Sequence, residues 1–100
     1  MDKELKIKRD IELVVGVVCD FFNVEVDSIY KRDRTSKATT ARGYAIYILH
    51  NDYGVSISRL SFEFKRIPRA IFWHCSKVKN FINCYPDYKE KYESICKMLK

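Results

Sequence analysis

The apolar residues near the start of the chain recur with the spacing of a helix. Over residues 4–22 they follow the i, i+4, i+7 rule despite many β-branched side chains: Ile7, Ile11, Val14, Val15, Val18 and Phe22. Such a pattern gives an amphipathic helix, so the rest of the chain must cover one of its faces. The chain contains only three glycines and two prolines, which means few turns and favours further helices over a many-stranded sandwich. The sequence therefore predicts an all-α fold.

The first two connections carry turn and cap signals. Asp27 is suited to cap a short helical turn that ends at Tyr30 and points Val26 and Ile29 inward. A helix is expected over residues 38–51, and Gly54 follows it as the natural left-handed residue. Its cap is expected to be one of three residues: Ser36, Thr39 or Thr40. Its buried residues are expected to be Ala41, Ala45, Ile48 and Leu49.

A compact pair of helices follows. Ser56 is expected to cap a helix over residues 57–64, and Pro68 opens the next one, which continues to about residue 82. Two short helices joined by a turn as short as residues 65–67 form a helix-turn-helix. Pro86 opens a last helix that ends at about residue 98. The apolar stripes of these helices are Ile57, Leu60 and Phe64, then Ile71, Cys75, Val78 and Ile82, then Tyr88, Tyr92, Ile95 and Met98.

The chain is basic, and its cations gather in two windows. The net charge is +6, and residues 31–42 and 65–79 together hold ten of the nineteen lysines and arginines. The second window contains no acidic residue. A fold that places both windows on one face would present an electrostatic footprint for a nucleic-acid backbone. The alternative is that these windows are ordinary solvated surface.

The second helix of the predicted motif carries polar residues opposite its buried stripe. Arg69, Trp73, Ser76 and Asn80 fall on that face, with Lys77 alongside. Arginine, asparagine and serine are residue types that hydrogen-bond base edges in a major groove. An indole on this face either contacts thymine methyl groups, packs on sugar, or buries against the basic loop or the final helix. His74 is expected to be packed or to contact phosphate, and not to bind a metal.

From about residue 11 to residue 78 the order of these features resembles a known family. The matching elements are residues 18–24, the turn over residues 26–30, the basic loop over residues 31–34, the helix start over residues 41–47, Ser56 with Ile57, Leu60 and Phe64, and residues 71–78. This arrangement resembles the C-terminal DNA-binding domain of the bacterial replication initiator DnaA, which contains a Trp-repressor-like helix-turn-helix. The resemblance implies that fold for residues 1–100, binding to double-stranded DNA, and a role in replication initiation or its regulation.

The resemblance also assigns roles to individual residues, and it has limits. It implies that Arg34 enters the minor groove and that Arg42 contacts phosphate. The family's Asp-His-Thr-Thr run at the start of the recognition helix is replaced here by residues 67–70, Ile-Pro-Arg-Ala. We therefore expect weak or no recognition of the initiator's own box, with Arg69 suited to read guanine instead. The chain has no phosphate-binding loop of the kind found in the family's ATPase module.

The sequence thus predicts a DNA-binding module with a defined set of contacts. Its expected DNA contacts are Arg32, Arg34, Lys37, Arg42, Lys65, Arg66, Arg69, Trp73, Ser76 and Lys77. A different interpretation is a protein-interaction adaptor that keeps the fold and has lost specific DNA binding. The altered recognition turn and Trp73 favour the adaptor, whereas Arg34 and the basic loop favour DNA. A separate protein partner is compatible with either interpretation, and neither fixes the oligomeric state.

Other classes of function find no pattern in the sequence. No paired carboxylates, Cys-His pair with an orienting residue, glycine loop or metal-ligand spacing is present, so we expect no enzyme activity, cofactor or metal. No apolar run reaches the length of a membrane span, and the first residues do not resemble a secretion signal, so a cytoplasmic bacterial protein is expected. Cys19 and Cys75 are expected in the core, while a Cys84–Cys96 disulfide is a minor alternative.

Overall fold

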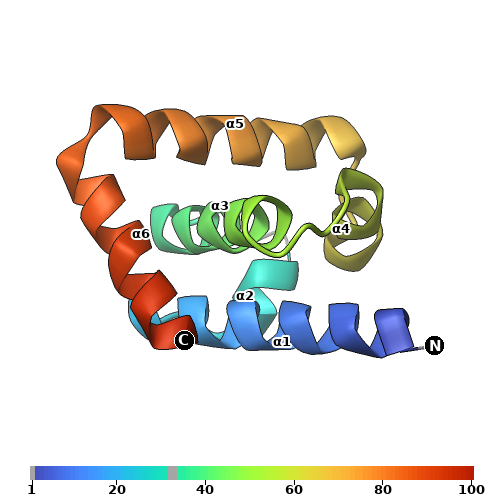
Figure 1. Cartoon of the computed structure of the whole chain (residues 1–100). Helices are drawn as coiled ribbons and strands as arrows, with labels where there is room; N and C mark the ends of the chain where they lie inside the picture. Colours follow the sequence, from blue (N-terminus) through green and yellow to red (C-terminus); the bar gives the residue numbers. More distant parts are fainter. Residues whose placement is uncertain (1, 32–33) are drawn as a thin grey trace.

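A computed structural model of the protein describes residues 2–31 and 34–100. Within these residues the chain forms helices and no strand, which confirms the all-α prediction (Figure 1). The helices are α1 (Asp2–Phe22), α2 (Val26–Tyr30), α3 (Ser36–Asn51), α4 (Ile57–Phe64), α5 (Pro68–Cys84) and α6 (Pro86–Leu99). None of the described helices combines the length and the apolar character that a membrane span requires.

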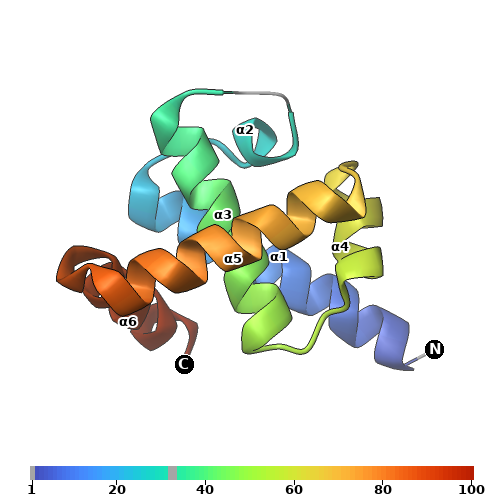
Figure 2. The ribbon, with the colours of Figure 1, turned by 90° about the horizontal axis from the view of Figure 1, so that it is seen from above.

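Helix α3 runs through the middle of the molecule, between α1 and α5. Figure 1 shows α1 and α5 on opposite sides of α3, and Figure 2 shows α5 crossing over it. Helices α2 and α4 lie beside α3, while α6 returns from the end of α5 towards α1 and packs against it. The hydroxyl of Tyr92 on α6 donates to Asp52 Oδ2 at 2.7 Å, which fastens α6 to the end of α3.

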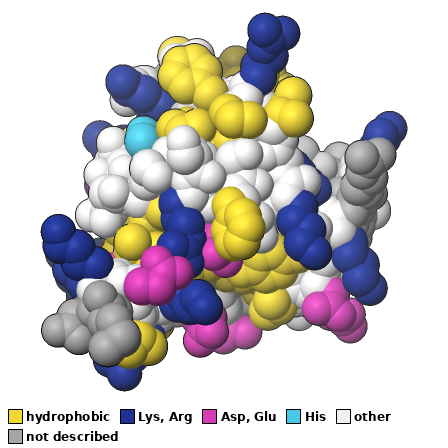
Figure 3. All heavy atoms as spheres, turned by 90° about the vertical axis from the view of Figure 1, so that its right-hand side faces the viewer, with side chains coloured by type: hydrophobic (Ala, Val, Ile, Leu, Met, Phe, Trp, Pro, Cys, Tyr) yellow, Lys and Arg dark blue, Asp and Glu magenta, His cyan; other side chains and the backbone are white. Residues whose placement is uncertain are grey.

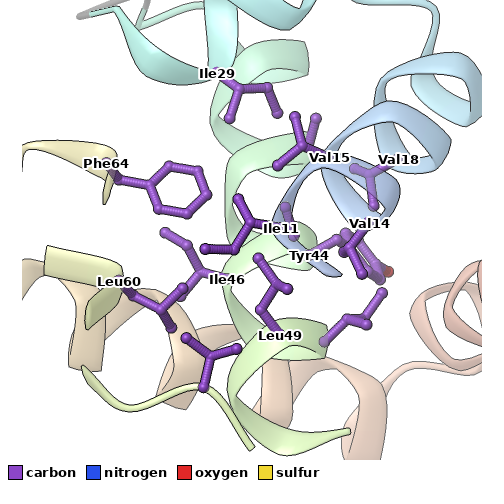
Figure 4. Close-up of a cluster of buried hydrophobic side chains, with 14 of the residues drawn as sticks. Ile11, Val14, Val15, Val18, Ile29, Tyr44, Ile46, Leu49, Leu60 and Phe64 are labelled. Atoms are coloured by element: carbon purple, nitrogen blue, oxygen red, sulfur yellow. The ribbon is translucent and has the colours of Figure 1, made fainter. Parts of the chain in front are cut away.

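The central position of α3 explains why most of its residues are buried. The expected core residues Ala41, Ala45, Ile48 and Leu49 are all fully buried. Tyr44 and Ile46, on other sides of the helix, are equally buried because α1, α4 and α5 cover those sides. Figure 4 shows the resulting core, in which side chains from α1, α2, α3 and α4 meet.

The expected periodicity of α1 is confirmed. Ile11, Val14, Val15 and Val18 are at most 3 % exposed, and Cys19 lies with them. The helix ends where Asn23 adopts a left-handed conformation (φ 57°) and the N–H of Val24 donates to the carbonyl of Cys19 at 3.0 Å. This is a C-terminal cap that satisfies the last carbonyl groups of the helix.

Two expectations about α2 are wrong. Asp27 does not cap the helix, because α2 begins at Val26, two residues earlier than an Asp27 cap requires, and Glu25 holds the cap position without a side-chain hydrogen bond. Val26 points outward and is 45 % exposed, whereas Ile29 is fully buried as expected. A helix of five residues has a single inward position, and Ile29 occupies it.

The caps of α3 and α4 define the connections on either side of the core. Helix α3 begins at Ser36, two residues earlier than expected, and its cap is Thr35, whose Oγ1 accepts from the N–H of Ala38 at 3.3 Å. The expected caps Ser36, Thr39 and Thr40 lie within the helix. Gly54 is left-handed (φ 71°) and Ser56 caps α4 by accepting from the N–H of Arg59 at 3.1 Å, both as expected.

The last two helices follow the expected stripes with small differences. Ile71, Cys75 and Val78 are buried and Ile82 is partly buried. On α6 only Ile95 is fully buried, and the expected core residue Met98 is 49 % exposed, because Leu99 takes the inward position at the end of the helix. Cys84 is exposed and the cysteines in the described chain are free, so the alternative of a Cys84–Cys96 disulfide is wrong.

Candidate nucleic-acid interface

The connection between α4 and α5 is a tight turn built from residues 65–67. Lys65 is left-handed (φ 53°), and its N–H donates to the carbonyl of Ser61. The hydroxyl of Ser61 in turn donates to the carbonyl of Arg66, while the Arg66 N–H donates back to Ser61 O at 3.1 Å. Pro68 then opens α5 at its first position. These bonds fix the direction in which α5 leaves α4 (Figure 2).

The side chain of Arg66 joins this turn to the basic loop between α2 and α3. Its Nη1 donates to Phe64 O at 2.8 Å and its Nη2 donates to Lys31 O at 2.9 Å. A surface groove lies along this junction. The groove is lined by Tyr30, Lys31, Lys65, Arg66, Ile67, Ala70 and His74. The first residue of one basic window therefore lies beside the first residues of the other.

Arg42 has a structural position that the sequence did not indicate. The residue is only 4 % exposed, whereas the sequence interpretation placed it against phosphate. Its Nε donates to Ile29 O at 2.8 Å, and its Nη2 donates to Ser28 O at 2.8 Å and to Lys31 O at 3.0 Å. A cation whose hydrogen bonds end on three carbonyls at the end of α2 orders the start of the basic loop. It does not present its charge to solvent, so the expected surface position is corrected.

The remaining predicted contacts fall into three groups. Exposed side chains are those of Arg34, Lys37, Lys65, Arg69 and Trp73, and partly buried ones are those of Arg66, Ser76 and Lys77. Arg32 lies outside the described residues. Within residues 2–31 and 34–100, the ion pairs join Arg59 to Glu4 and Glu63. The exposed cations of both windows thus form no ion pair with another described residue.

Trp73 is half exposed, at 51 %, and is held by its neighbours on α5. The ammonium of Lys77 lies 4.7 Å from the indole centroid, a cation–π contact, and the His74 ring meets the indole edge-on at a centroid distance of 5.0 Å. With half of its surface exposed, the indole is not buried, so the alternative of a buried Trp73 is wrong. The Lys77 ammonium, expected on phosphate, is directed towards aromatic rings.

His74 lies beneath the interface and is 7 % exposed. Burial, together with the positive charges of Arg42, Arg66 and Lys77, lowers its pKa to about 4. The imidazole is therefore neutral near pH 7 and adds no charge to the groove. Its packed position is one of the two that the sequence allowed. The described residues contain no group of histidine, cysteine and carboxylate side chains that could hold a metal ion.

Sequence reasoning missed an apolar part of this surface. Phe72 is 63 % exposed and Ile67 is 67 % exposed, and with Trp73 they surround the start of α5; Phe62 on α4 is 75 % exposed. Figure 3, which views the end of the molecule with α4 and the start of α5, shows hydrophobic side chains together with lysines and arginines on this face. The helical wheel contains the signal, because Phe72 falls outside the stripe formed by Ile71, Cys75 and Val78.

Comparison with known families and curated proteins adds no assignment: no family model matches the chain, and no curated protein matches it. The resemblance to the DnaA C-terminal domain therefore stays a prediction based on the order and spacing of the sequence features.

Proposed function

We propose that the protein binds double-stranded DNA through the end of the molecule where the basic loop meets the α4–α5 turn. The observation that carries this proposal is the hydrogen bond from Arg66 Nη2 to Lys31 O, at 2.9 Å, which couples the two basic windows. The two windows are separate along the sequence, and this bond brings Lys31 of the first beside Lys65 and Arg66 of the second. Phosphates along a duplex backbone are the polyanion that such a group of cations suits.

Each part of the surface takes a distinct role in the proposal. In this proposal α5 is the recognition helix, and Arg69 in its first turn contacts base edges. Arg34, at the exposed end of the basic loop, enters the adjacent minor groove, as the resemblance implies. Lys37 and Lys65 contact phosphates and so position the domain without reading sequence. Arg42 acts indirectly, by ordering the carbonyls that begin the loop.

The resemblance extends this proposal to a role in replication initiation or its regulation in a bacterial cytoplasm. Duplex binding is the step that this role requires, so the proposal is tested at that level first.

The test is fluorescence anisotropy of a labelled random-sequence duplex, titrated with wild-type protein, Arg34→Ala and the control Lys97→Ala at several salt concentrations. Lys97 is exposed and carries one positive charge, as Arg34 does, but it lies on α6, away from the α4–α5 turn (Figure 1). The wild type should bind with a log–log salt slope of about −0.9 per phosphate contact. Arg34→Ala should weaken binding at every salt concentration, and Lys97→Ala should not. If both variants lost the same affinity for the duplex, binding would depend only on the net charge of the protein, and the proposed surface would be contradicted.

A protein-interaction adaptor is the second candidate, and the exposed apolar residues at the start of α5 favour it. If the protein does not bind the duplex even at low salt, the result would favour the protein-interaction adaptor. A partner protein would then be sought whose binding is lost in Trp73→Ala.

A further inference from the structure

The outer face of α5 is apolar at the end that would enter a groove first. Phe72 and Trp73 expose 63 % and 51 % of their surface, and Ile67, at the cap of the helix, exposes 67 %. We call these three residues the α5 aromatic face. Exposed apolar side chains gathered at one place on a protein surface mark a contact site. At least half of the surface of each of the three residues stays exposed in the described part of the chain.

The surroundings of the α5 aromatic face restrict what can contact it. Arg69 lies one turn before Trp73 on the same side of the helix, and Lys65 precedes the helix. No acidic residue occurs between residues 65 and 85. A purely apolar partner would leave these cations desolvated and unpaired, which is costly. The partner must therefore offer apolar groups between negative charges.

We propose that the α5 aromatic face binds the C5-methyl groups of thymine in the DNA major groove, so that the protein prefers thymine-bearing duplexes. The inference rests on the proposed duplex binding and adds which chemical group of the DNA helix α5 recognises. The thymine methyl group is the apolar feature of the base edges in the major groove, and phosphates border that groove on both sides. Phe72 and Trp73 lie on either side of Arg69 around the helix, so methyl contacts would flank the base pair that Arg69 reads.

The local packing of Trp73 suits a contact of this kind. The Lys77 ammonium over one part of the ring and the edge of His74 hold the indole in place in the absence of any ligand. A side chain that is already ordered loses little conformational entropy when a partner covers it. The methyl groups would meet the part of the indole that now faces solvent.

The experiment compares duplexes that differ only in these methyl groups. A random-sequence duplex library is enriched for binding to the protein and then amplified in parallel with thymidine or deoxyuridine triphosphate. Replacing thymine by uracil removes the C5-methyl and leaves every base-pairing group and phosphate in place. The wild type should bind the uracil pool more weakly, by about fourfold for each methyl group contacted.

Matched variants assign the difference to α5. Phe72→Ala and Trp73→Ala should each reduce the difference between the pools, because each variant loses only its own methyl contact. The double variant should bind both pools with the same affinity, close to that of the wild type for the uracil pool. Phe62→Ala removes a phenylalanine from α4 that is even more exposed than Phe72 and should keep the wild-type ratio. Helical circular dichroism of each variant verifies that it folds. Trp73 is the only tryptophan of the chain, so its fluorescence should change on binding to the thymine pool and change less with the uracil pool.

The outcomes separate this inference from the proposed function. Equal binding of the two pools by the wild type would overturn the methyl contact and leave duplex binding intact. A single strand bound more tightly than its duplex would also overturn it, because the aromatic residues would then stack on bases. Binding to neither pool at low salt, together with binding to anionic lipid vesicles, would overturn both, since aromatic residues among cations also suit a membrane surface.

Discussion

Helices α3 and α5 cross at the centre of the molecule, yet they differ in which side chains they bury and which they expose. Helix α3 is covered by its neighbours on most of its circumference and buries even an arginine. Helix α5 buries one stripe against α3 and leaves aromatic side chains in solvent. In α3 a charged side chain serves the fold, and in α5 apolar side chains are available for contact. Residue type alone would therefore predict an exposed arginine in α3 and buried aromatic residues in α5. The position of each residue in the fold gives the opposite result.

The comparison is tested most strongly by removing the buried arginine. Arg42→Ala should lower the free energy of unfolding by about 3 kcal/mol, because three carbonyl groups lose a charged donor and the bond to the Ile29 carbonyl is buried. Urea denaturation followed by circular dichroism measures this loss. The matched change in an exposed arginine, Arg34→Ala, should stay within about 0.5 kcal/mol of the wild type. Similar losses in the two variants would mean that Arg42 is not the structural residue its contacts suggest.

The closeness of the α3–α5 crossing provides a second test. A Cβ added at Gly43 would lie 2.9 Å from Val78 Cγ2 and 3.6 Å from His74 Nδ1. Because a buried valine cannot move away easily, Gly43→Ala should destabilise the protein by about 1–3 kcal/mol in spite of the better helix propensity of alanine. The control is Gly16→Ala on α1, where a Cβ meets nothing within 4 Å. That variant should become more stable, by about 0.5–1 kcal/mol. Two changes of the same sign would show that the crossing is looser than its geometry indicates.

The sequence predicted the helices well because each one carries its own signal. The apolar period of α1, the cap Ser56 and the opening prolines of α5 and α6 are local features, and local features can be read from a chain. The caps of α2 and α3 were misplaced by one or more residues, because several residues near each helix start are suited to the cap position. The errors in burial have a different cause, which is the environment of the residue. Val26 and Met98 were expected inside because they are apolar and at helical spacing, but no other element covers them.

The candidate site was only partly predictable, for a physical reason. The composition of the two basic windows was visible, whereas their junction depends on a hydrogen bond between Arg66 and the carbonyl of Lys31, 35 residues apart in the sequence. The burial of Arg42 depends likewise on the carbonyl groups of α2. Backbone carbonyls are the same for every residue type, so no sequence pattern shows where a distant arginine will find them.

A pH dependence should follow from the histidine between the two helices. The pKa of His74 is lowered by burial from its ordinary value of 6.5 to about 4 in the folded protein. Between these pH values the unfolded chain binds the proton more readily, so stability is full above pH 6.5 and falls as the pH declines towards 4. From pH 7 to pH 5 the free energy of unfolding should fall by about 2 kcal/mol at most, since one pKa unit corresponds to about 1.4 kcal/mol.

Urea denaturation at pH 7, 6 and 5 measures this slope, and His74→Gln provides the control. The variant lacks the titrating group, so the part of the slope that depends on His74 should disappear even if the variant is less stable at every pH. A slope that persists unchanged in His74→Gln would assign the effect to other groups. It would also remove the argument that the imidazole is held neutral beneath the interface.

The smallest change in stability is expected on the outer side of α5. Phe72→Ala removes a side chain that is 63 % exposed, so the free energy of unfolding should change by no more than about 0.5 kcal/mol. Its counterpart is Phe64→Ala, which removes a fully buried ring from the end of α4 and should cost about 3–5 kcal/mol. Denaturation of the two variants under one set of conditions compares the same chemical change in the two settings. A large loss of stability in Phe72→Ala would mean that the ring packs in the core. Phe72 would then not belong to the surface proposed to bind DNA. A small loss would show that the fold does not need this large apolar side chain, which is what a ring available for contact with DNA requires.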